Sequence, residues 1–215
     1  MSPELWFALG ISILQTIEMI IFSTFFAFII GLPMGIGLFL CRPGSLSHCP
    51  WLYRLLAFIV NIVRSIPFII LLVLLIPFTR LLIGTSIGTT AAIVPLSIGA
   101  APFIARLVDN ALQEIPFGLI EAGISMGMNR WQIVTRVLLP ESYSGIVNGL
   151  TLTVVALIGY TAMAGAVGGG GLGDLAIQYG YNMFNTTLML ITVVVLIVMV
   201  QATQWIGELL AKRRV

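Results

Sequence analysis

Long apolar runs separated by short polar stretches dominate the pattern along this chain. A run of roughly 20 helical residues crosses a hydrocarbon core about 30 Å thick. Five groups of apolar residues meet that length, and they cover Glu18–Leu40, Leu55–Pro77, Thr90–Val108, Ile146–Val167 and Thr186–Ile206. The mixed stretch Trp6–Thr16 precedes the first group and can extend it. The pattern therefore predicts an all-α membrane protein with five transmembrane helices.

The composition leads to the same class of protein. Of the 215 residues, 59% are hydrophobic and 8% are charged, and the mean hydropathy is +1.11. Soluble domains carry about 25% charged residues. We expect one membrane domain over residues 1–215, with a core of about 10–210, and contact with lipid. A net charge of +2 gives no reason to expect a nucleic-acid partner.

Basic residues gather on alternate connections between the predicted spans. They are Arg42 and Arg54 after the first span, Arg106, Arg130 and Arg136 around the third connection, and Lys212, Arg213 and Arg214 at the end. The connection Gly168–Asn185 has no basic residue, and Arg80 is the one exception to the alternation. The positive-inside rule therefore predicts an external N-terminus and a cytoplasmic C-terminus, which five crossings satisfy.

Small residues four apart recur within the spans, where they let helix backbones approach closely. These pairs are Gly31/Gly35, Gly145/Gly149 and Gly165/Gly169. Prolines inside or beside the spans predict kinks. They are Pro33, Pro67, Pro95 and Pro102.

The sequence offers no nucleotide or metal site of its own. A phosphate-binding loop needs a lysine, and the chain's single lysine, Lys212, lies outside any such motif. The glycines of Gly168–Gly173 formally match a dinucleotide fingerprint, but they follow a span rather than a strand, so they predict a flexible external turn. Cys41 and Cys49 lack a second pair that would complete a zinc site. If ATP drives this protein, another subunit must bind it.

Four ionisable residues lie within or beside the spans, where charge is costly. They are Glu18, Arg64, Arg106 and Asp109. Arg106 and Asp109 are three residues apart and are expected to pair. Glu18 lies at the outer headgroup boundary or, alternatively, serves with Asp109 as a proton carrier in an ATP-independent secondary transporter. Five spans do not divide into the inverted repeats typical of such transporters. An intramembrane enzyme would need a paired nucleophile and base inside a span, and the sequence shows no such pair.

Polar residues interrupt the apolar pattern between the third and fourth spans, in the segment 116–140, which we call the elbow. Pro116 suits the first turn of a short helix, and Gly127 suits its C-terminal stop. Asn129 and Gln132 have the spacing of a capping box for a second helix, which Pro140 is expected to end. The apolar faces are assigned to Phe117, Ile120 and Ile124 in the first helix and to Trp131, Val134 and Leu138 in the second. A surface connector would also have this form.

The elbow resembles the EAA loop of binding-protein-dependent ABC importer permeases. That family's pattern is E-A-A-x3-G-x9-I-x-L-P, and here it begins at Glu121-Ala122-Gly123, continues at Gly127 and ends at Val137–Pro140. The chain departs from the pattern in having glycine at 123 and valine at 137. Both changes keep the small or β-branched character of the position.

The resemblance extends over about residues 10 to 210, and three stretches look like permeases of methionine importers in particular. They are Asn61–Gly88, Ala91–Pro116 and Gly159–Tyr181. The resemblance implies a bacterial inner-membrane permease without enzymatic activity, working as two copies. It also implies two ATPase subunits that bind ATP and Mg, and a periplasmic or lipid-anchored binding protein. Methionine, in both enantiomers, is the cargo implied, and another amino acid is the alternative.

Site residues follow from the same resemblance. The elbow would serve as a coupling helix, with contacts to the ATPase assigned to Glu121, Ala122, Gly123, Met126, Gly127, Leu139 and Pro140. In the fourth span, the substrate path is assigned to Tyr160, Thr161 and Met163, for which ordinary helix packing is the alternative.

Overall fold

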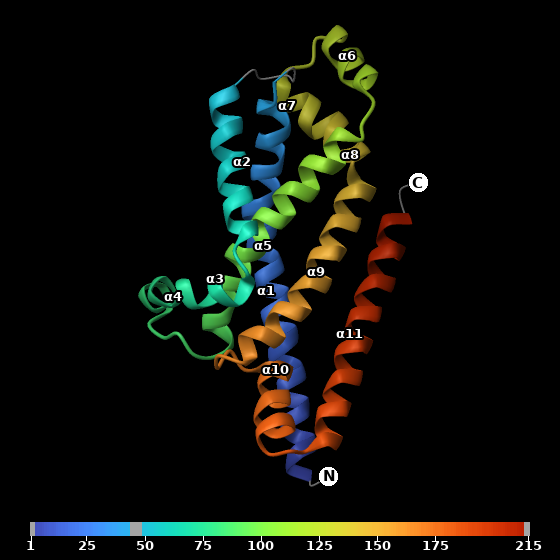
Figure 1. Ribbon diagram of the computed structural model, residues 1–215. Coiled ribbons are helices and arrows are strands. Elements are labelled where there is room, and N and C mark those ends of the chain that lie inside the picture. Colours follow the sequence, from blue (N-terminus) through green and yellow to red (C-terminus); the bar gives the residue numbers. More distant parts are fainter. Residues whose placement is uncertain (1–2, 44–48, 213–215) are drawn as a thin grey trace.

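A computed structural model describes residues 3–43 and 49–212, and every regular element in these ranges is a helix (Figure 1). Two short π-helical segments, η1 and η2, continue neighbouring α-helices. In chain order the elements are α1 (Pro3–Cys41), α2 (Pro50–Ser65), α3 (Phe68–Leu74), α4 (Ile76–Ile83), α5 (Thr89–Gln113), α6 (Phe117–Ser125), α7 (Arg130–Ile133), η1 (Val134–Leu138), α8 (Leu139–Glu141), α9 (Tyr143–Gly165), α10 (Gly171–Leu175), η2 (Ala176–Asn182) and α11 (Thr186–Lys212).

Four helices, α1, α5, α9 and α11, are each long and apolar enough to cross a membrane without a break. A fifth span exists among the described residues only if α2 and α3 count as one, and these two helices are bent by 104°. The span predicted over Leu55–Pro77 is thus formed by two helices with a sharp bend at Pro67, where the sequence predicted a kink. Pro67 lacks an N–H group and forces Ile66 into an extended conformation, with φ −83° and ψ 125°, so α2 ends at Ser65.

The centre of the bundle is α5, which packs along α1 over much of its length. In its most apolar stretch 61% of the residues are buried, against 11% for α11. A Cβ atom on Gly31 or Gly35 would lie 2.6 Å from a backbone oxygen of α5. On the other side of α5, Gly145 and Gly149 of α9 make similarly close contacts. Two of the predicted glycine pairs are thus seams between helices.

The third pair belongs to a tight turn that follows α9. Gly165 packs directly on the backbone of Gly173, and the chain then reverses through glycines with positive φ, including Gly171 at 78°. The Gly171 N–H donates to Gln15 Oε1 at 2.9 Å, and the Leu172 N–H donates to the Thr16 hydroxyl at 2.9 Å. One buried and one partly buried hydrogen bond therefore hold the turn against α1, whereas a flexible turn was predicted.

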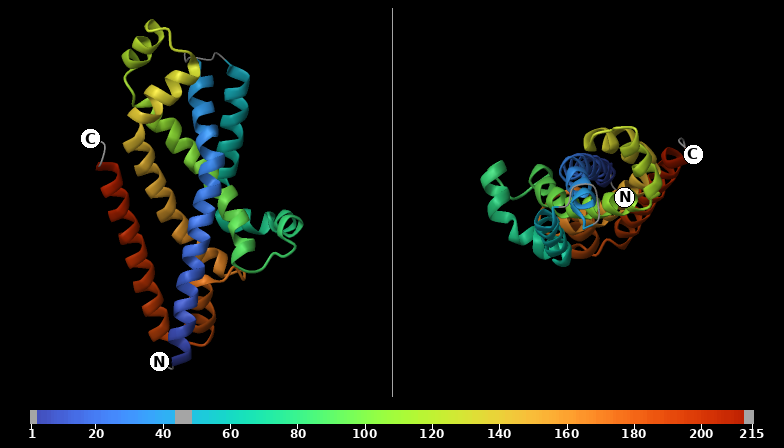
Figure 2. Two further views of the ribbon diagram at one scale, coloured as in Figure 1. Left: turned by 180° about the vertical axis from the view of Figure 1, so that it is seen from behind. Right: turned by 90° about the horizontal axis from the view of Figure 1, so that it is seen from above.

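The two ends of the bundle differ in what they carry. Figures 1 and 2 place α6, α7, the end of α1 and the start of α2 at one end, and the start of α1 with α10 at the other. Helix α11 starts beside α10 and runs back toward the end that carries α6. We call these the elbow end and the opposite end.

Candidate coupling elbow and substrate path

The first helix of the elbow, α6, projects from the bundle at the elbow end (Figure 1). Pro116 lies at its N-cap with ψ 129°, one residue before the helical turn that was predicted for it. The helix stops at Gly127, whose φ of 75° is a conformation that glycine adopts without strain. The Met128 N–H then donates to the Gly123 carbonyl at 3.1 Å, which satisfies one of the last carbonyls of the helix. The predicted glycine stop is confirmed.

The second helix of the elbow begins with the predicted capping box. The Gln132 N–H donates to Asn129 Oδ1 at 2.8 Å, and the Asn129 N–H donates to Gln132 Oε1 at 2.8 Å. These reciprocal bonds satisfy two backbone donors that a helix start leaves open. The turn between α6 and α7 is therefore fixed by local chemistry.

Pro140 does not end the second helix, contrary to the prediction. Because Pro140 has no N–H group, the helix loses one regular bond there, and the backbone widens into the π-helical turn η1 just before it. The Leu139 N–H bonds to the Val134 carbonyl, and the Ser142 N–H bonds to the Leu138 carbonyl at 2.9 Å. Hydrogen-bonded helix thus continues from the elbow into α9.

The residues assigned to coupling point in different directions. Glu121, Ala122, Met126 and Gly127 are exposed, whereas Gly123 is buried. A Cβ atom on Gly123 would lie 3.5 Å from Ile133 Cγ1, an ordinary van der Waals distance. Gly123 therefore faces the second helix of the elbow and not an external partner. Leu139 is half-buried and Pro140 is exposed at the start of the path into α9.

The elbow carries several exposed apolar side chains, although its sequence contains more polar residues than the spans do. Val134 and Leu138 are buried as predicted, but Trp131 is 73% exposed and does not join their face. The other exposed apolar side chains of the elbow are Phe117, Leu119, Ile124 and Met126. We call these five side chains the exposed apolar patch of the elbow, and exposed apolar surface typically marks a contact with protein or with membrane.

A buried charge cluster lies where α1, α2 and α5 meet. Asp109 is fully buried, and its Oδ2 atom accepts a hydrogen bond from Arg106 Nη1 at 3.2 Å, as predicted from their spacing. Arg42 Nη2 approaches the same oxygen at 3.9 Å, and Arg106 Nη2 donates to Asn61 Oδ1 at 3.3 Å. The Asp109 carboxylate therefore links Arg42, directly after α1, to α5, and Arg106 links α5 to Asn61 of α2.

The three residues assigned to the substrate path do not share a surface. The Tyr160 ring stacks on Phe68 with 4.4 Å between centroids and 7° between planes. Thr161 is buried and donates to the Ile158 carbonyl at 2.8 Å, which is a bond within its own helix. Met163 is exposed. Of the three, Tyr160 alone lines a cavity at the bend between α2 and α3.

That cavity has a volume of about 170 Å³ and is lined by Arg64, Phe68, Phe103 and Tyr160, with neighbouring apolar residues. The guanidinium carbon of Arg64 lies 5.7 Å from the centre of the Phe103 ring, within the range of a cation–π contact. The sequence marked Arg64 only as a charge within a span. Arg64 lines the same cavity as Phe103 and Tyr160, and the three residues belong to three different helices. A local sequence pattern cannot reveal such a grouping.

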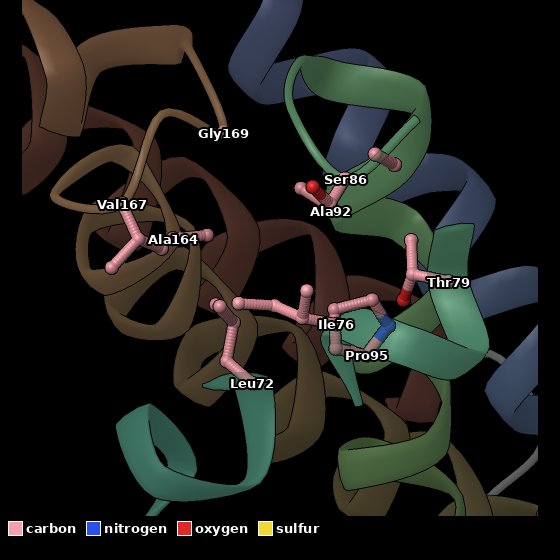
Figure 3. Close-up of a pocket in the computed structure, with 10 residues that line it drawn as sticks. Leu72, Ile76, Thr79, Ser86, Ala92, Pro95, Ala164, Val167 and Gly169 are labelled. Carbon is pink, nitrogen blue, oxygen red and sulfur yellow. The ribbon is translucent and has the colours of Figure 1, made fainter. Parts of the chain in front are cut away.

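A second cavity lies where the α3–α4 pair, α5 and the end of α9 meet (Figure 3). It is lined by Leu72, Ile76, Thr79, Pro95 and Val167, among others, and its volume is about 20 Å³. This is about the space of one water molecule and too little for an amino acid. Of these two cavities, the one beside Arg64 is therefore the better candidate for a place on the substrate path.

The described residues contain no group of three or more His, Cys, Asp or Glu side chains placed to hold a metal ion. Cys41 is buried and Cys49 is exposed, and both are free thiols.

Helices with apolar outer surfaces and a projecting elbow define an integral membrane protein of the helix-bundle class. The chain belongs to the family described as binding-protein-dependent transport system inner membrane component, which matches residues 27–215.

Curated relatives and solved structures agree with this family. The chain is 53% identical over 213 residues to a probable D-methionine transport system permease protein from Pasteurella multocida, covering 99% of this chain and 98% of that one. It is 52% identical over 164 residues to the D-methionine transport system permease protein of Escherichia coli, covering 76% and 75%.

Among solved structures, a chain of the MetNI methionine ABC transporter in inward-facing conformations matches with a TM-score of 0.98 and 52% identity over 100% of both chains. A chain of an amino acid ABC transporter with histidines matches with a TM-score of 0.77, covering 96% of this chain and 94% of that one. Because that chain is only 18% identical, it shows the fold alone.

These matches confirm the predicted family, the role as a transport subunit rather than an enzyme, and the location in the bacterial inner membrane. They decide against the proton-coupled secondary transporter with Glu18 and Asp109 as carriers. Both residues have other surroundings in the structure, since Asp109 is bound by two arginines and Glu18 lines an apolar groove between α1, α4 and α5.

Proposed function

We propose that this chain is the membrane-spanning permease subunit of an ATP-driven importer of methionine, in the L and D forms. Two similarities carry the proposal. The chain is 53% identical, over nearly its full length, to a probable D-methionine transport permease. It also matches a chain of a methionine ABC transporter structure with 52% identity and a TM-score of 0.98. We propose a single permease domain over residues 1–215. An importer of another amino acid is the nearest alternative.

The proposed assembly holds two copies of this chain, two ATPase subunits and a binding protein that delivers the cargo from outside. ATP and Mg belong to the ATPase subunits, since this chain's single lysine, Lys212, lies at the end of α11 outside any phosphate-binding motif. The exposed apolar patch of the elbow is the surface that we assign to the ATPase.

The elbow end is proposed to face the cytoplasm and the start of α1 to face outward. Supporting this orientation, Arg42 follows α1, Arg54 lies near the start of α2, and Arg130 and Arg136 lie in α7 and η1. The end of α1, the start of α2 and α7 lie at one end of the bundle. Lys212 ends α11, which runs toward that same end. Two further basic residues of the predicted C-terminal cluster, 213 and 214, lie outside the described residues.

Coupling is proposed to work as a rigid lever. ATP binding would draw the two ATPases together and carry the two elbows with them. Because hydrogen-bonded helix runs from the elbow past Pro140 into α9, a displacement of α6 would be passed to the membrane bundle. ATP shifts this equilibrium only by binding one state of the ATPase pair more tightly than the other.

The seven assigned residues divide into two tasks in this proposal. Glu121, Ala122, Met126 and Gly127 are exposed and would contact the ATPase directly. The other three hold the elbow in shape or connect it to α9, and they are Gly123, Leu139 and Pro140.

A reconstituted transport assay tests the proposal. The tagged chain is purified from membranes with its ATPase and placed in vesicles with the binding protein, and methionine uptake is measured with and without ATP. We expect ATP-dependent uptake and, for Glu121→Lys, about tenfold lower uptake, because a reversed charge opposes the partner surface. Glu4→Lys reverses an exposed charge at the opposite end and serves as the control. Uptake that persists without nucleotide, or purification without an ATPase, contradicts the proposal.

A further inference from the structure

Arg64 lies far along a membrane span for a residue that carries a permanent charge. It is in the last turn of α2, 14 residues after Pro50 (64 − 50), which is about 21 Å along a helix that rises 1.5 Å per residue. The apolar part of a bilayer is only about 30 Å thick. A cation at such depth faces the interior of the protein or an aqueous path and needs an anionic partner.

The described residues supply no such partner. The ion pairs in this part of the chain join Arg42 and Arg106 to Asp109, and Lys212 to Glu208, and none includes Arg64. Its one specific contact is with the face of the Phe103 ring. Arg64 is exposed and lines the cavity of about 170 Å³ at the α2–α3 bend, so its guanidinium is open to a ligand there.

The neighbourhood adds to the positive charge instead of cancelling it. One helical turn before Arg64, Asn61 accepts a hydrogen bond from Arg106. Arg106 and Arg42 share the single carboxylate of Asp109, so this aspartate is already engaged by two arginines. Arg64 is the charged residue among those that line the cavity, and it would attract an anion that enters.

We infer that this cavity holds the carboxylate of an amino acid as it crosses the membrane, with Arg64 as its binding partner. The inference rests on the proposed function and specifies the cargo-binding residue. The planar guanidinium can donate two parallel hydrogen bonds to a carboxylate. Phe68, Phe103 and Tyr160 line the same cavity, so an apolar or thioether side chain would lie against aromatic rings.

The size of the cavity agrees with this cargo. Sites for drug-sized ligands occupy about 300–1,000 Å³, and a cavity of about 170 Å³ suits a smaller molecule. Recognition through the carboxylate is compatible with the proposed transport of both enantiomers, because the carboxylate is common to the L and D forms.

Discrimination between two ligands tests the inference. Equilibrium dialysis measures the Kd of the permease–ATPase complex, without binding protein, for L-methionine and for L-methioninol, in which an alcohol replaces the carboxylate. For the unmodified complex we expect methioninol to bind about tenfold more weakly, as for loss of one charge-assisted contact. In Arg64→Gln the ratio of the two Kd values should fall to about one. The control is Arg80→Gln, which removes an arginine of α4 that donates to the Ser86 hydroxyl. It should keep the ratio of the two Kd values found for the unmodified complex.

Each outcome decides the inference. If the ratio of the two Kd values is the same in the unmodified complex and in Arg64→Gln, the inference is wrong. This result would be expected if a lipid phosphate or a carboxylate of the second copy neutralises Arg64. If Arg64→Gln does not assemble, Arg64→Lys keeps the charge without the planar fork and should give an intermediate ratio. An unmodified complex that does not distinguish methioninol also overturns the inference. Failure of the proposed function is a separate result, namely no ATP-dependent methionine uptake by the unmodified transporter.

Discussion

In the α1–α5 seam, glycine is needed for space, whereas in the elbow it is needed for a backbone angle. A Cβ atom on Gly35 would lie 2.6 Å from both the Ala105 oxygen and Val108 Cβ. A Cβ atom on Gly127 would meet nothing within 4 Å, but its φ of 75° strains any residue with a side chain. The same residue type therefore supports the assembly of the bundle in one region and the shape of a projecting arm in the other.

The difference separates folding from coupling. Residues of the seam contact other helices along the centre of the bundle, so a change there acts on the whole membrane domain. The elbow is held by its own glycine stop and capping box, so a change there stays local. Substitutions in the two regions should accordingly have different readouts, and they can be ordered by the size of the expected effect.

Gly35→Leu should have the largest effect. The added side chain overlaps the backbone of α5, and overpacking of this kind costs about 3 kcal/mol or more. We expect loss of folded protein, measured as thermal unfolding in detergent by size-exclusion chromatography. Gly10→Leu, on the same helix but with open space around it, is the matched control. Equal unfolding temperatures in both variants would refute the close seam.

Asp109→Asn should have the next largest effect. It leaves Arg42 and Arg106 without their shared carboxylate, and breaking a fully buried ion pair costs about 3–5 kcal/mol. Because these arginine side chains are 35% and 27% exposed, water compensates in part, and we expect about 2 kcal/mol. The measurement is again thermal unfolding, at low and high salt. An unchanged unfolding temperature would mean that the cluster does not hold the three helices together.

Gly127→Val should leave the bundle folded and impair transport. A β-branched residue at this angle costs about 1–2 kcal/mol locally and reshapes the turn between α6 and α7. We expect a normal unfolding temperature together with lower methionine uptake per ATP hydrolysed. Gly127→Asn, which tolerates positive φ, should keep most of the coupling. If both variants couple equally well, the backbone angle is not what matters at this position.

Gly123→Ala should have the smallest effect. Its new methyl group lies at an ordinary distance from Ile133, and alanine favours helix over glycine by about 1 kcal/mol. We expect a slightly higher unfolding temperature and unchanged coupled ATPase activity. A loss of coupling would show that residue 123 meets the ATPase after all, and not the second helix of the elbow.

The elbow was largely predictable because its chemistry is local. The Gly127 stop and the Asn129–Gln132 capping box each depend on residues within four positions, and both are confirmed. The exposure of Trp131 was not predictable, because periodicity groups it with Val134 and Leu138 without showing which neighbours are present.

Two prolines mark the limit of such local reasoning about the spans. Pro67 separates α2 from α3 at a bend of 104°, whereas Pro140 lies within a helical path that widens into a π turn. Both stand in apolar stretches that suggest helix, and the choice between a break and a widened turn depends on packing against other helices. The same holds for Arg64, whose aromatic neighbours Phe103 and Tyr160 come from distant parts of the chain.

The hydrogen bonds between α1 and the glycine turn also set an order of events during synthesis. Gln15 and Thr16 are bonded to backbone groups 156 residues further along the chain. At roughly 5–20 residues per second, ribosomes need about 8–31 seconds to make that length. During this time Gln15 lacks the backbone N–H from which it accepts in the finished protein, and so does Thr16, although its hydroxyl can already donate to the Ser12 carbonyl. Residues made late in synthesis therefore supply the last hydrogen bonds of α1. A chain truncated before Gly171 would leave Gln15 and Thr16 without these bonds.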